Sequence, residues 1–310
     1  MGGTSIEWCD MVLNCVTGCT KVSEGCRFCY AERVFPRAYG KAEIEESVVV
    51  DGITANKVRR REFTDVLMHP DRLELPLHWR KPRRIFVNSM SDLFHEDVPF
   101  EFIDKVFAMM ALCPQHCFQV LTKRPERMLE FCSSNETRDR LVNETIRLTE
   151  GISGTSLTIS ETGDGLNGVR LENVQLGISC EDQKTADERT AYLRATPAAV
   201  RFISYEPALQ SVNFNLQGIH WLICGGESGP GARPMHPGWA RSVRDQCQAA
   251  GVPFFFKQWG EYLHRDAMTD QQFALIDATE NLANTAEQYF RVGKKFAGAL
   301  LDGREWREFP

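Results

Sequence analysis

Several features are missing from this 310-residue sequence, and each absence excludes a class of protein. No apolar run reaches the roughly 18 residues that a membrane-spanning helix needs, so we expect no membrane partner. The first residues, MGGTSIEWCDMV, lack a basic segment followed by an apolar one. They therefore do not predict a signal peptide, and a cytoplasmic location follows by default.

A basic excess is also missing, because the formal net charge is −6. This argues against a protein that simply coats nucleic acid. Two local basic patches, KVRRREF at 57–63 and RKPRR at 80–84, are equally compatible with solvated loops and with phosphate contacts. The rest of the composition, 43% hydrophobic and 25% charged, is typical of a globular chain with one large domain or two small ones.

Cysteine, by contrast, is abundant and unevenly distributed. Five of the eleven cysteines lie within the first 29 residues, and the other six are spread over positions 113 to 247. In a reducing cytosol, clustered cysteines more often indicate a metal site, whereas scattered ones are typical of packed cores. We therefore interpret the first group as chemical and most of the second group as packing.

Short apolar, β-branched runs recur along the chain, and each ends in polar or glycine-rich residues. Runs of this length are typical of strands buried on both faces. They occupy residues 10–16, 84–92, 117–125, 174–182, 200–207, 219–229 and 252–261, and helix-like stretches lie between them at 99–114, 185–197 and 236–251. This alternation predicts an α/β fold with about seven parallel strands. A full or partial (β/α) TIM-like barrel fits it better than an open sheet.

Two stretches break this alternation, and we interpret residues 41–80 and 133–172 as insertions over the barrel. Residues 1–265 would then form the barrel. Residues 266–310 would form a C-terminal helical extension, with a helix-like segment at 269–290. The sequence assigns no chemical role to this extension.

Polar residues gather where six of the predicted strands end. In a (β/α) barrel these carboxyl ends meet at one rim, where active sites form. Six such clusters in succession favour a shared functional rim over ordinary loop polarity. The clusters are Asn88, Ser89, Ser91 and Asp92; Thr122, Lys123 and Arg124; Ser179, Glu181 and Asp182; Ser204 and Glu206; Gly225, Gly226 and Glu227; and Lys257, Gln258 and Trp259.

The segment CTKVSEGCRFCYAER at 19–33 places Cys19, Cys26 and Cys29 within eleven residues. Three close thiolates suit zinc or an iron–sulfur cluster. Structural zinc needs four protein ligands, and no second compact pair follows. Cys113 and Cys117, with His116 between them, are a distant but possible partner, and Cys15 is a nearer candidate. An iron–sulfur cluster held by three cysteines leaves a coordination position open, so the fourth ligand need not come from the protein.

The end of this segment, GCRFCYAE, resembles the radical S-adenosylmethionine signature, in which three cysteines share a loop and an aromatic residue precedes the last. The usual spacing of three and then two is six and then two here. The whole chain, apart from 133–172, resembles a phage- and prophage-associated three-cysteine family of unknown function that is grouped with these proteins. Its blocks include VTGCTKVSEGCRFCYAER, VNSMSDLFHEDVPFEFI, FQVLTKRPERM, GISCEDQKTADER, ICGGESGPGARPMHPGW, FFFKQWGE and LLDGREW. That family usually has proline at the position of Cys15, so we interpret Cys15 as incidental.

The resemblance implies a radical S-adenosylmethionine type of partial barrel, with a 4Fe–4S cluster bound by Cys19, Cys26 and Cys29. It implies an enzyme, in which the cluster and S-adenosylmethionine generate a 5′-deoxyadenosyl radical that takes hydrogen from a substrate. The implied cofactor contacts are Asn88, Ser89, Ser91, Asp92, Lys123, Ser179, Glu181, Glu206, Gly225, Gly226 and Glu227, and the implied substrate contacts are Arg124, Lys257 and Trp259. Some have plainer alternatives, namely helix capping for Ser91 and Asp92 and packing for Trp259.

The phage association favours a substrate in nucleic acid or its precursors. We expect an isomerase that rearranges a hypermodified, amino-acid-bearing thymine in phage DNA, inside the bacterial host. The base would leave the stack to reach the rim. The expected electron donor is a flavodoxin-like reductant, for which dithionite substitutes in vitro.

Three alternatives remain open. Radical repair of a damaged DNA base would use the same chemistry. A non-catalytic zinc or iron–sulfur binding module would use the cysteines alone. A barrel hydrolase fits least, because His69, His95 and His236 are isolated in sequence and are interpreted as packing or capping residues.

Overall fold

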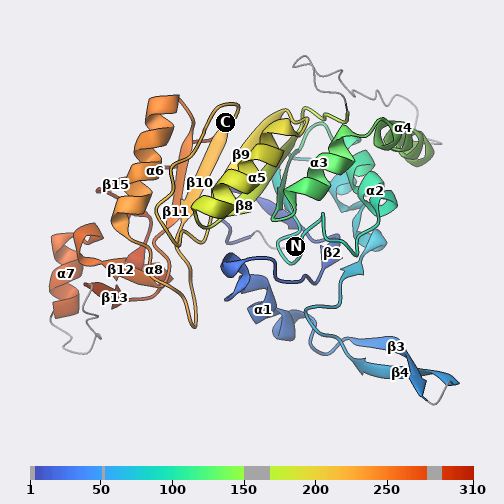
Figure 1. The fold of residues 1–310 in the computed structure, drawn as a ribbon, viewed down its shortest axis with the longest axis horizontal. Coiled ribbons are helices and arrows are strands. Elements are labelled where there is room, and N and C mark those ends of the chain that lie inside the picture. The colour runs from blue at the N-terminus through green and yellow to red at the C-terminus, as the bar shows by residue number, and fades with distance from the viewer. Residues whose placement is uncertain (1–3, 51–52, 150–167, 278–287) are drawn as a thin grey trace.

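The computed structural model describes residues 4–50, 53–149, 168–277 and 288–310 (Figure 1). Its central element is a curled sheet of seven parallel strands whose spatial order follows the chain. The strands are β1 (Met11–Leu13), β6 (Arg84–Val87), β7 (Cys117–Thr122), β8 (Val174–Cys180), β9 (Val200–Tyr205), β10 (Trp221–Gly225) and β11 (Phe254–Gln258). The sheet is a half-barrel, so the predicted α/β fold with about seven parallel strands is confirmed, and the barrel is partial.

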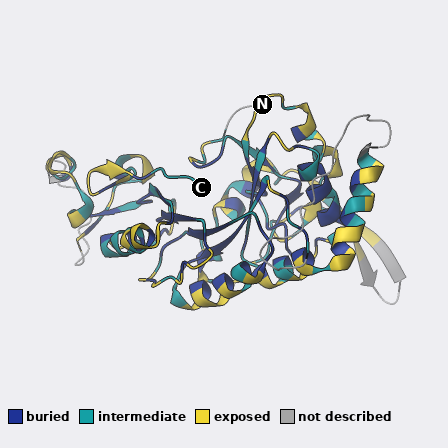
Figure 2. Ribbon diagram, turned by 90° about the horizontal axis from the view of Figure 1, so that it is seen from above, coloured by how far each residue is buried: buried dark blue, intermediate teal, exposed yellow. Residues whose placement is uncertain are grey.

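Helices cover one face of this sheet (Figures 1 and 2). They are α2 (Phe100–Ala111), α3 (Pro125–Ser133), α4 (Asn135–Thr149), α5 (Gln183–Ala195) and α6 (Pro237–Ala250). The helices predicted from apolar spacing correspond to α2, α5 and α6. Helix α6 has Pro237 at its first turn and ends at Gly251, whose φ of 66° is the left-handed conformation that glycine adopts readily.

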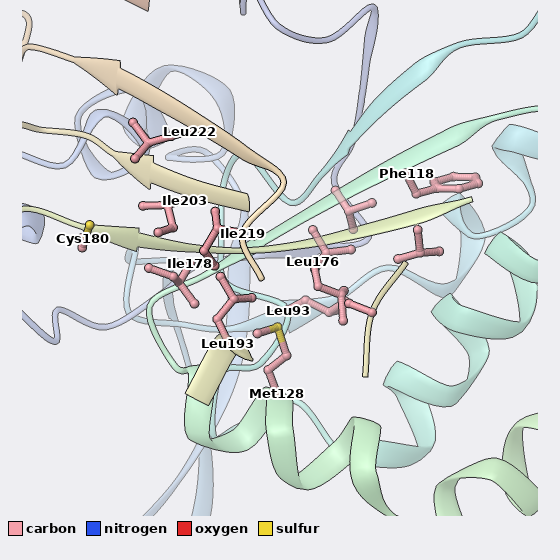
Figure 3. Packing of buried hydrophobic residues seen from close by; sticks show 14 of the residues in the cluster. Leu93, Phe118, Met128, Leu176, Ile178, Cys180, Leu193, Ile203, Ile219 and Leu222 are labelled. Atoms are coloured by element: carbon pink, nitrogen blue, oxygen red, sulfur yellow. The ribbon is translucent and has the colours of Figure 1, made fainter. Parts of the chain in front are cut away.

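Alternate strand residues face two separate cores. The outer core lies between the sheet and the helices, and Figure 3 shows Met128 of α3 and Leu193 of α5 against Leu176, Ile178 and Ile203 of the strands. Because side chains alternate along a strand, the intervening residues face the other side. This pattern explains why the strand sequences are nearly continuous in apolar residues.

The inner core is smaller and mainly aromatic. Phe86, Phe202, Trp221 and Phe255 come from four strands and pack around Trp8 of the N-terminal segment. The Trp8 ring lies 4.6 Å from the Phe86 ring and 6.2 Å from the Trp221 ring, between centroids. The N-terminal segment therefore fills the inside of the half-barrel below the carboxyl ends of its strands.

The first predicted insertion contains an antiparallel ribbon. Strands β3 (Glu43–Val50) and β4 (Ile53–Arg60) pair along their whole length and project from the body of the molecule (Figure 1). The short strands β2 (Val16–Thr17) and β5 (Leu67–Met68) pair next to the cysteine segment, which leads into α1 (Tyr30–Ala38). The second predicted insertion begins with α4, and its residues 150–167 lie outside the described part of the chain.

The C-terminal extension contains both helices and short strands. Helix α7 covers Asp270–Asp277, within the helix-like segment predicted at 269–290, and residues 278–287 of that segment lie outside the described residues. Tyr289–Arg291 forms β13, which pairs with β12 (Tyr262–His264). The extension continues through α8 (Lys294–Ala297), β14 (Leu300–Leu301) and β15 (Arg304–Glu305).

The end of the chain covers the free edge of β11. The backbone N–H of Phe256 donates to the carbonyl of Trp306 at 2.9 Å, and the Trp221 indole N–H donates to the carbonyl of Glu308 at 2.8 Å. A covered edge cannot pair with another chain. The extension is thus part of the barrel's structure. Within the described residues, no helix is long and apolar enough to cross a membrane.

We predict that Trp306→Ala lowers the free energy of unfolding by about 3 kcal/mol, because it leaves a cavity where the buried indole packs against Phe254. Urea denaturation would measure the change. The matched control is Glu305→Ala, an exposed neighbour for which we expect a change within about 0.5 kcal/mol. Equal effects of the two substitutions would contradict the packing role of Trp306.

Candidate functional site

A cavity of about 490 Å³ lies at the carboxyl ends of the parallel strands. This volume is within the roughly 300–1,000 Å³ that is common for small-molecule sites. Most of the predicted site residues line it together, as do Thr122, Ser204 and Gln258 of the predicted rim. The site residues that line it are Cys19, Cys26, Cys29, Asn88, Ser89, Ser91, Asp92, Lys123, Arg124, Ser179, Glu206, Gly226, Glu227 and Lys257. Glu181, Gly225 and Trp259 do not line the cavity.

The three cysteines of the 19–33 segment differ from the others in exposure. Cys19, Cys26 and Cys29 are half-buried at the cavity wall, whereas seven of the other eight cysteines are buried and only Cys117 is half-buried. All eleven thiols are free. Cys15 is buried outside the cavity, and its burial raises the pKa of its thiol to about 12. The structure therefore offers no support for Cys15 as a fourth ligand.

The cysteine segment has little regular structure and is held by contacts to the rim. Its 3₁₀ turn, Glu24–Cys26, lies over β8, where the backbone N–H of Gly25 donates to Glu181 Oε1 at 3.2 Å. Glu181 is fully buried and also accepts from Arg189 at 3.1 Å. A side chain at Gly25 would meet Glu181 and Lys123 at 2.9 Å, so only glycine fits there without a shift. Glu181, predicted as a cofactor contact, instead positions the segment.

Two cations at the end of β7 face the thiols. Lys123 Nζ lies 3.7 Å from Cys26 Sγ, and Arg124 Nη1 lies 3.7 Å from Cys19 Sγ. Burial disfavours the Cys26 thiolate, but the Lys123 charge and local hydrogen bonds outweigh it, so the pKa of Cys26 is lowered. Burial, reinforced by the Asp92 charge, raises the pKa of Cys19 to about 12 despite Arg124. In the free protein, Cys26 is therefore the more readily ionised of these two thiols.

Asp92 organises these cations from the end of β6. Its Oδ2 atom accepts from the Lys123 backbone N–H at 3.0 Å and from Arg124 Nη1 at 3.3 Å. Its Oδ1 atom accepts from the Thr122 hydroxyl at 2.7 Å and from the Phe94 backbone N–H at 3.0 Å. The carboxylate is therefore occupied by the protein itself. The helix-capping alternative for Ser91 and Asp92 is wrong, because α2 begins at Phe100 directly after Pro99. Asp92 instead caps a local turn at Phe94 and has little capacity left for a cofactor.

Two histidines support threonines on either side of Cys19. His95 Nε2 lies 2.9 Å from Thr20 Oγ1, and His69 Nε2 lies 2.7 Å from Thr17 Oγ1. His95 is buried, and burial together with the Arg124 charge lowers its pKa, so it is neutral at pH 7. These contacts agree with the interpretation of the histidines as packing residues, and His236 caps α6 as expected.

Two arginines that the sequence analysis did not single out join the cysteine segment to the loop after β10. Arg33 Nη1 donates to the Ser228 carbonyl at 2.8 Å. Arg233 Nη2 donates to the Glu24 carbonyl and to Glu227 Oε1, both at 2.9 Å, and its backbone N–H and Nε donate to Glu227 Oε2. The Glu227 carboxylate therefore forms part of this clamp, although Glu227 still borders the cavity.

The cavity floor combines apolar surface with unpaired polar atoms. Trp8, Phe86 and Leu121 contribute the apolar part. Three buried polar atoms of lining residues have no hydrogen-bond partner in the described part of the protein: Trp8 Nε1, Asn88 Nδ2 and Gln258 Oε1. Buried polar groups are normally paired. Two donors and one acceptor of the cavity-lining residues are therefore left unpaired by the described part of the protein.

An ion pair closes the β9–β11 side of the cavity. Lys257 Nζ and Glu206 Oε1 are 2.6 Å apart. Burial disfavours the Lys257 ammonium, but the Glu206 carboxylate outweighs it, so the pKa of Lys257 is raised and the lysine stays charged. Gly225 allows the strand to pass Glu206, since an added side chain would lie 3.2 Å from Glu206 Oε1.

Trp259, predicted as a substrate contact, is a packing residue. It is 2% exposed, its indole N–H donates to the Leu300 carbonyl at 2.9 Å, and its ring lies 4.8 Å from that of Phe256. In a continuing strand Lys257 and Trp259 would face the same side, but β11 ends at Gln258, so Trp259 is released from the alternation and packs in the outer core. Position near the rim did not indicate which way this side chain turns.

Across the described residues, no group of three or more His, Cys, Asp or Glu side chains has a geometry that could hold a metal ion. A ligand role for the cysteines therefore depends on their shared cavity, their half-buried thiols and their cationic neighbours.

Comparison with known families matches residues 3–310 to the model of DUF5131, which is described as a protein of unknown function. The match extends over nearly the whole chain, including the cysteine segment, the rim and the C-terminal extension. No curated protein and no solved structure matches the chain.

We predict that Lys123→Met slows alkylation of Cys26 by iodoacetamide severalfold in the metal-free protein at pH 7. Loss of the ammonium beside Cys26 raises the thiol pKa, and the smaller thiolate fraction reacts more slowly. Mass spectrometry of peptides would give the rate at each cysteine. Lys184→Met, on the exposed face of α5, is the matched control and should leave the rate unchanged. A pH profile unmoved by Lys123→Met would refute this electrostatic role.

Proposed function

Because this chain belongs to the DUF5131 family, whose function is unknown, its function must be inferred from its own residues, and we propose that it is a radical S-adenosylmethionine enzyme. One observation carries this proposal. Three half-buried cysteines open onto one cavity at the carboxyl ends of a parallel half-barrel. Catalytic sites of (β/α) barrels lie at this end of the strands.

The residues present suit a 4Fe–4S cluster. Cys19, Cys26 and Cys29 would hold it, since thiolates are the usual ligands and each would bind a different iron. Lys123 and Arg124 point their donors at two of the sulfurs. Hydrogen bonds and positive charge at the sulfurs stabilise ligating thiolates and tune a cluster's potential. No fourth cysteine lines the cavity, which suits a cluster with one position left for a cofactor.

When bound, the cluster and S-adenosylmethionine would supply a reducing electron and a 5′-deoxyadenosyl radical for hydrogen abstraction. The protein's own part is to bind, orient and exclude water. Trp8, Phe86 and Leu121 give the cavity a dry floor. Asn88 is oriented by the Val16 backbone N–H, which donates to its Oδ1 at 3.0 Å, so its unpaired Nδ2 is available to a ligand carbonyl or carboxylate.

The remaining polar residues divide between cofactor and substrate. Ser89, Ser91 and Ser179 donate their hydroxyl protons to protein oxygens, so each offers acceptor lone pairs to the cavity. We assign them, with Asn88 and Lys123, to S-adenosylmethionine. Glu206 and Lys257 come from β9 and β11, whose ends make no hydrogen bond to the cysteine segment among the described residues. We assign this pair to the substrate.

The identity of the substrate and of the reductant stays a prediction. Rearrangement of a hypermodified thymine in phage DNA and radical repair of a DNA base would both use this site. A non-catalytic metal-binding module would not need a cavity of this size, because structural metal sites are closed by their protein ligands. The cavity therefore favours catalysis.

We predict that anaerobic reconstitution with iron and sulfide loads a 4Fe–4S cluster, and that dithionite with S-adenosylmethionine then yields 5′-deoxyadenosine. Cys26→Ala should lose both the cluster's visible absorbance and the product, because one of three ligands is gone. Cys117→Ala is the matched control, since Cys117 is also half-buried but lies outside the cavity. Iron analysis and chromatography would measure the two outcomes.

Full cluster occupancy in Cys26→Ala would overturn the ligand assignment. Stoichiometric zinc in the purified protein, without a cluster or 5′-deoxyadenosine after reconstitution, would overturn the enzyme and favour the non-catalytic module.

A further inference from the structure

A second cavity of about 350 Å³ adjoins the main one, and we call it the side cavity. The two share Glu7, Lys257, Gln258 and Lys294 in their walls. The other walls of the side cavity come from the C-terminal extension, namely Lys295, Gly298, Ala299 and Arg307. A molecule bound in the main cavity can therefore extend into the side cavity past Lys257 and Gln258.

The side cavity is strongly basic. Four basic residues and one acidic residue line it, which is a net formal charge of +3 in a chain whose total is −6. Like charges so close together repel each other in the empty cavity and attract an anion. The local charge is opposite to that of the protein as a whole, so general surface composition does not account for it.

The cations differ in how far the protein already neutralises them. Lys257 pairs with Glu206, and Lys294 Nζ lies 3.1 Å from Glu7 Oε1. Lys295 is exposed and has no ion pair or hydrogen bond with any of the described residues. Arg307 uses Nη1 to donate to the Phe256 carbonyl at 3.1 Å and stacks on Phe255, which leaves other guanidinium N–H groups available.

Gln258 adds an independent sign of a ligand between the two cavities. It is 5% exposed, and its Nε2 donates to the Gly226 carbonyl at 3.2 Å. This contact orients the amide, because the opposite orientation would place two acceptors together. Its Oε1 is buried without a partner. A hydroxyl or N–H donor of a bound molecule, or a water, would satisfy this oxygen.

We propose that the side cavity binds a phosphate group of the substrate, and that a hydroxyl or N–H group next to the phosphate donates to Gln258. The inference rests on the proposed function in one respect, the use of the main cavity for the reacting part of the substrate. Phosphate suits the site better than a carboxylate, because its higher charge matches Lys295 and Arg307, the two cations that no carboxylate of the described residues neutralises, and its oxygens match both Lys and Arg donors.

Isothermal titration calorimetry on the full chain would test the proposal, with thymidine 5′-monophosphate and thymidine as probes. We expect the monophosphate to bind more tightly, and Lys295→Ala to weaken its binding about fivefold, which is the effect of one partly exposed charge pair. Lys184→Ala, a lysine on the exposed face of α5, is the matched control and should change nothing. Rising salt should weaken monophosphate binding and spare thymidine.

The source of the phosphate is distinguished by a further probe, short single-stranded DNA. If the natural substrate is DNA, the single-stranded DNA should bind with a steeper salt dependence than the monophosphate. If the natural substrate is a free nucleotide, the monophosphate should bind at least as tightly as the DNA. Either result supports the side cavity if Lys295→Ala weakens it. The proposal would be overturned if monophosphate and thymidine bound with equal affinity, or if neither bound. It would also be overturned if the Lys295→Ala variant bound both phosphate probes with the affinity of the wild type.

The titration needs no cluster, so its outcome is separate from that of reconstitution. A variant with Cys19, Cys26 and Cys29 all changed to alanine should still bind the monophosphate, because none of these residues lines the side cavity. Phosphate binding without cluster assembly would leave this inference standing and the proposed function refuted. Cluster assembly without phosphate binding would leave the proposed function standing and refute this inference.

Discussion

The structure depends most on the contact between a buried carboxylate and a loop. Glu181 is fully buried at the end of β8, where an unpaired charge would be costly, and it is satisfied by Arg189 and by the backbone N–H of Gly25. The cysteine segment cannot position itself, since its only regular element before α1 is one 3₁₀ turn. The hydrogen bond from Gly25 to Glu181 fixes this segment on the rim, and the thiols face the cavity as a result.

Charge at the rim has two effects that oppose each other. Asp92 orders Lys123 and Arg124 beside the thiols, yet the same carboxylate helps to raise the pKa of Cys19. In the proposed site, iron would favour the thiolate form of both Cys19 and Cys26. The raised pKa of the free Cys19 thiol therefore does not oppose its proposed role as a ligand.

The strands and most of the cavity could be predicted from the sequence because both follow from local patterns. Apolar runs indicate strands buried on two faces, and residues that follow parallel strands share a rim. The direction of each side chain could not be predicted, which is why Glu181 and Trp259 were assigned to ligands. Arg33 and Arg233 were missed because their partners lie 195 and 209 residues away. No local pattern signals a contact at that separation.

The C-terminal extension was the least predictable part, because its strands β13, β14 and β15 are only two or three residues long, too short for an alternating pattern. Its packing explains why it belongs to the site. Trp306 and the backbone around it cover the edge of β11, and that docking brings Arg307 and α8 to Lys257 and Gln258. The segment that completes the sheet therefore also supplies most of the cations of the side cavity. A change that undocks the extension would therefore remove two things together: the cover over the edge of β11 and most of the cations of the side cavity.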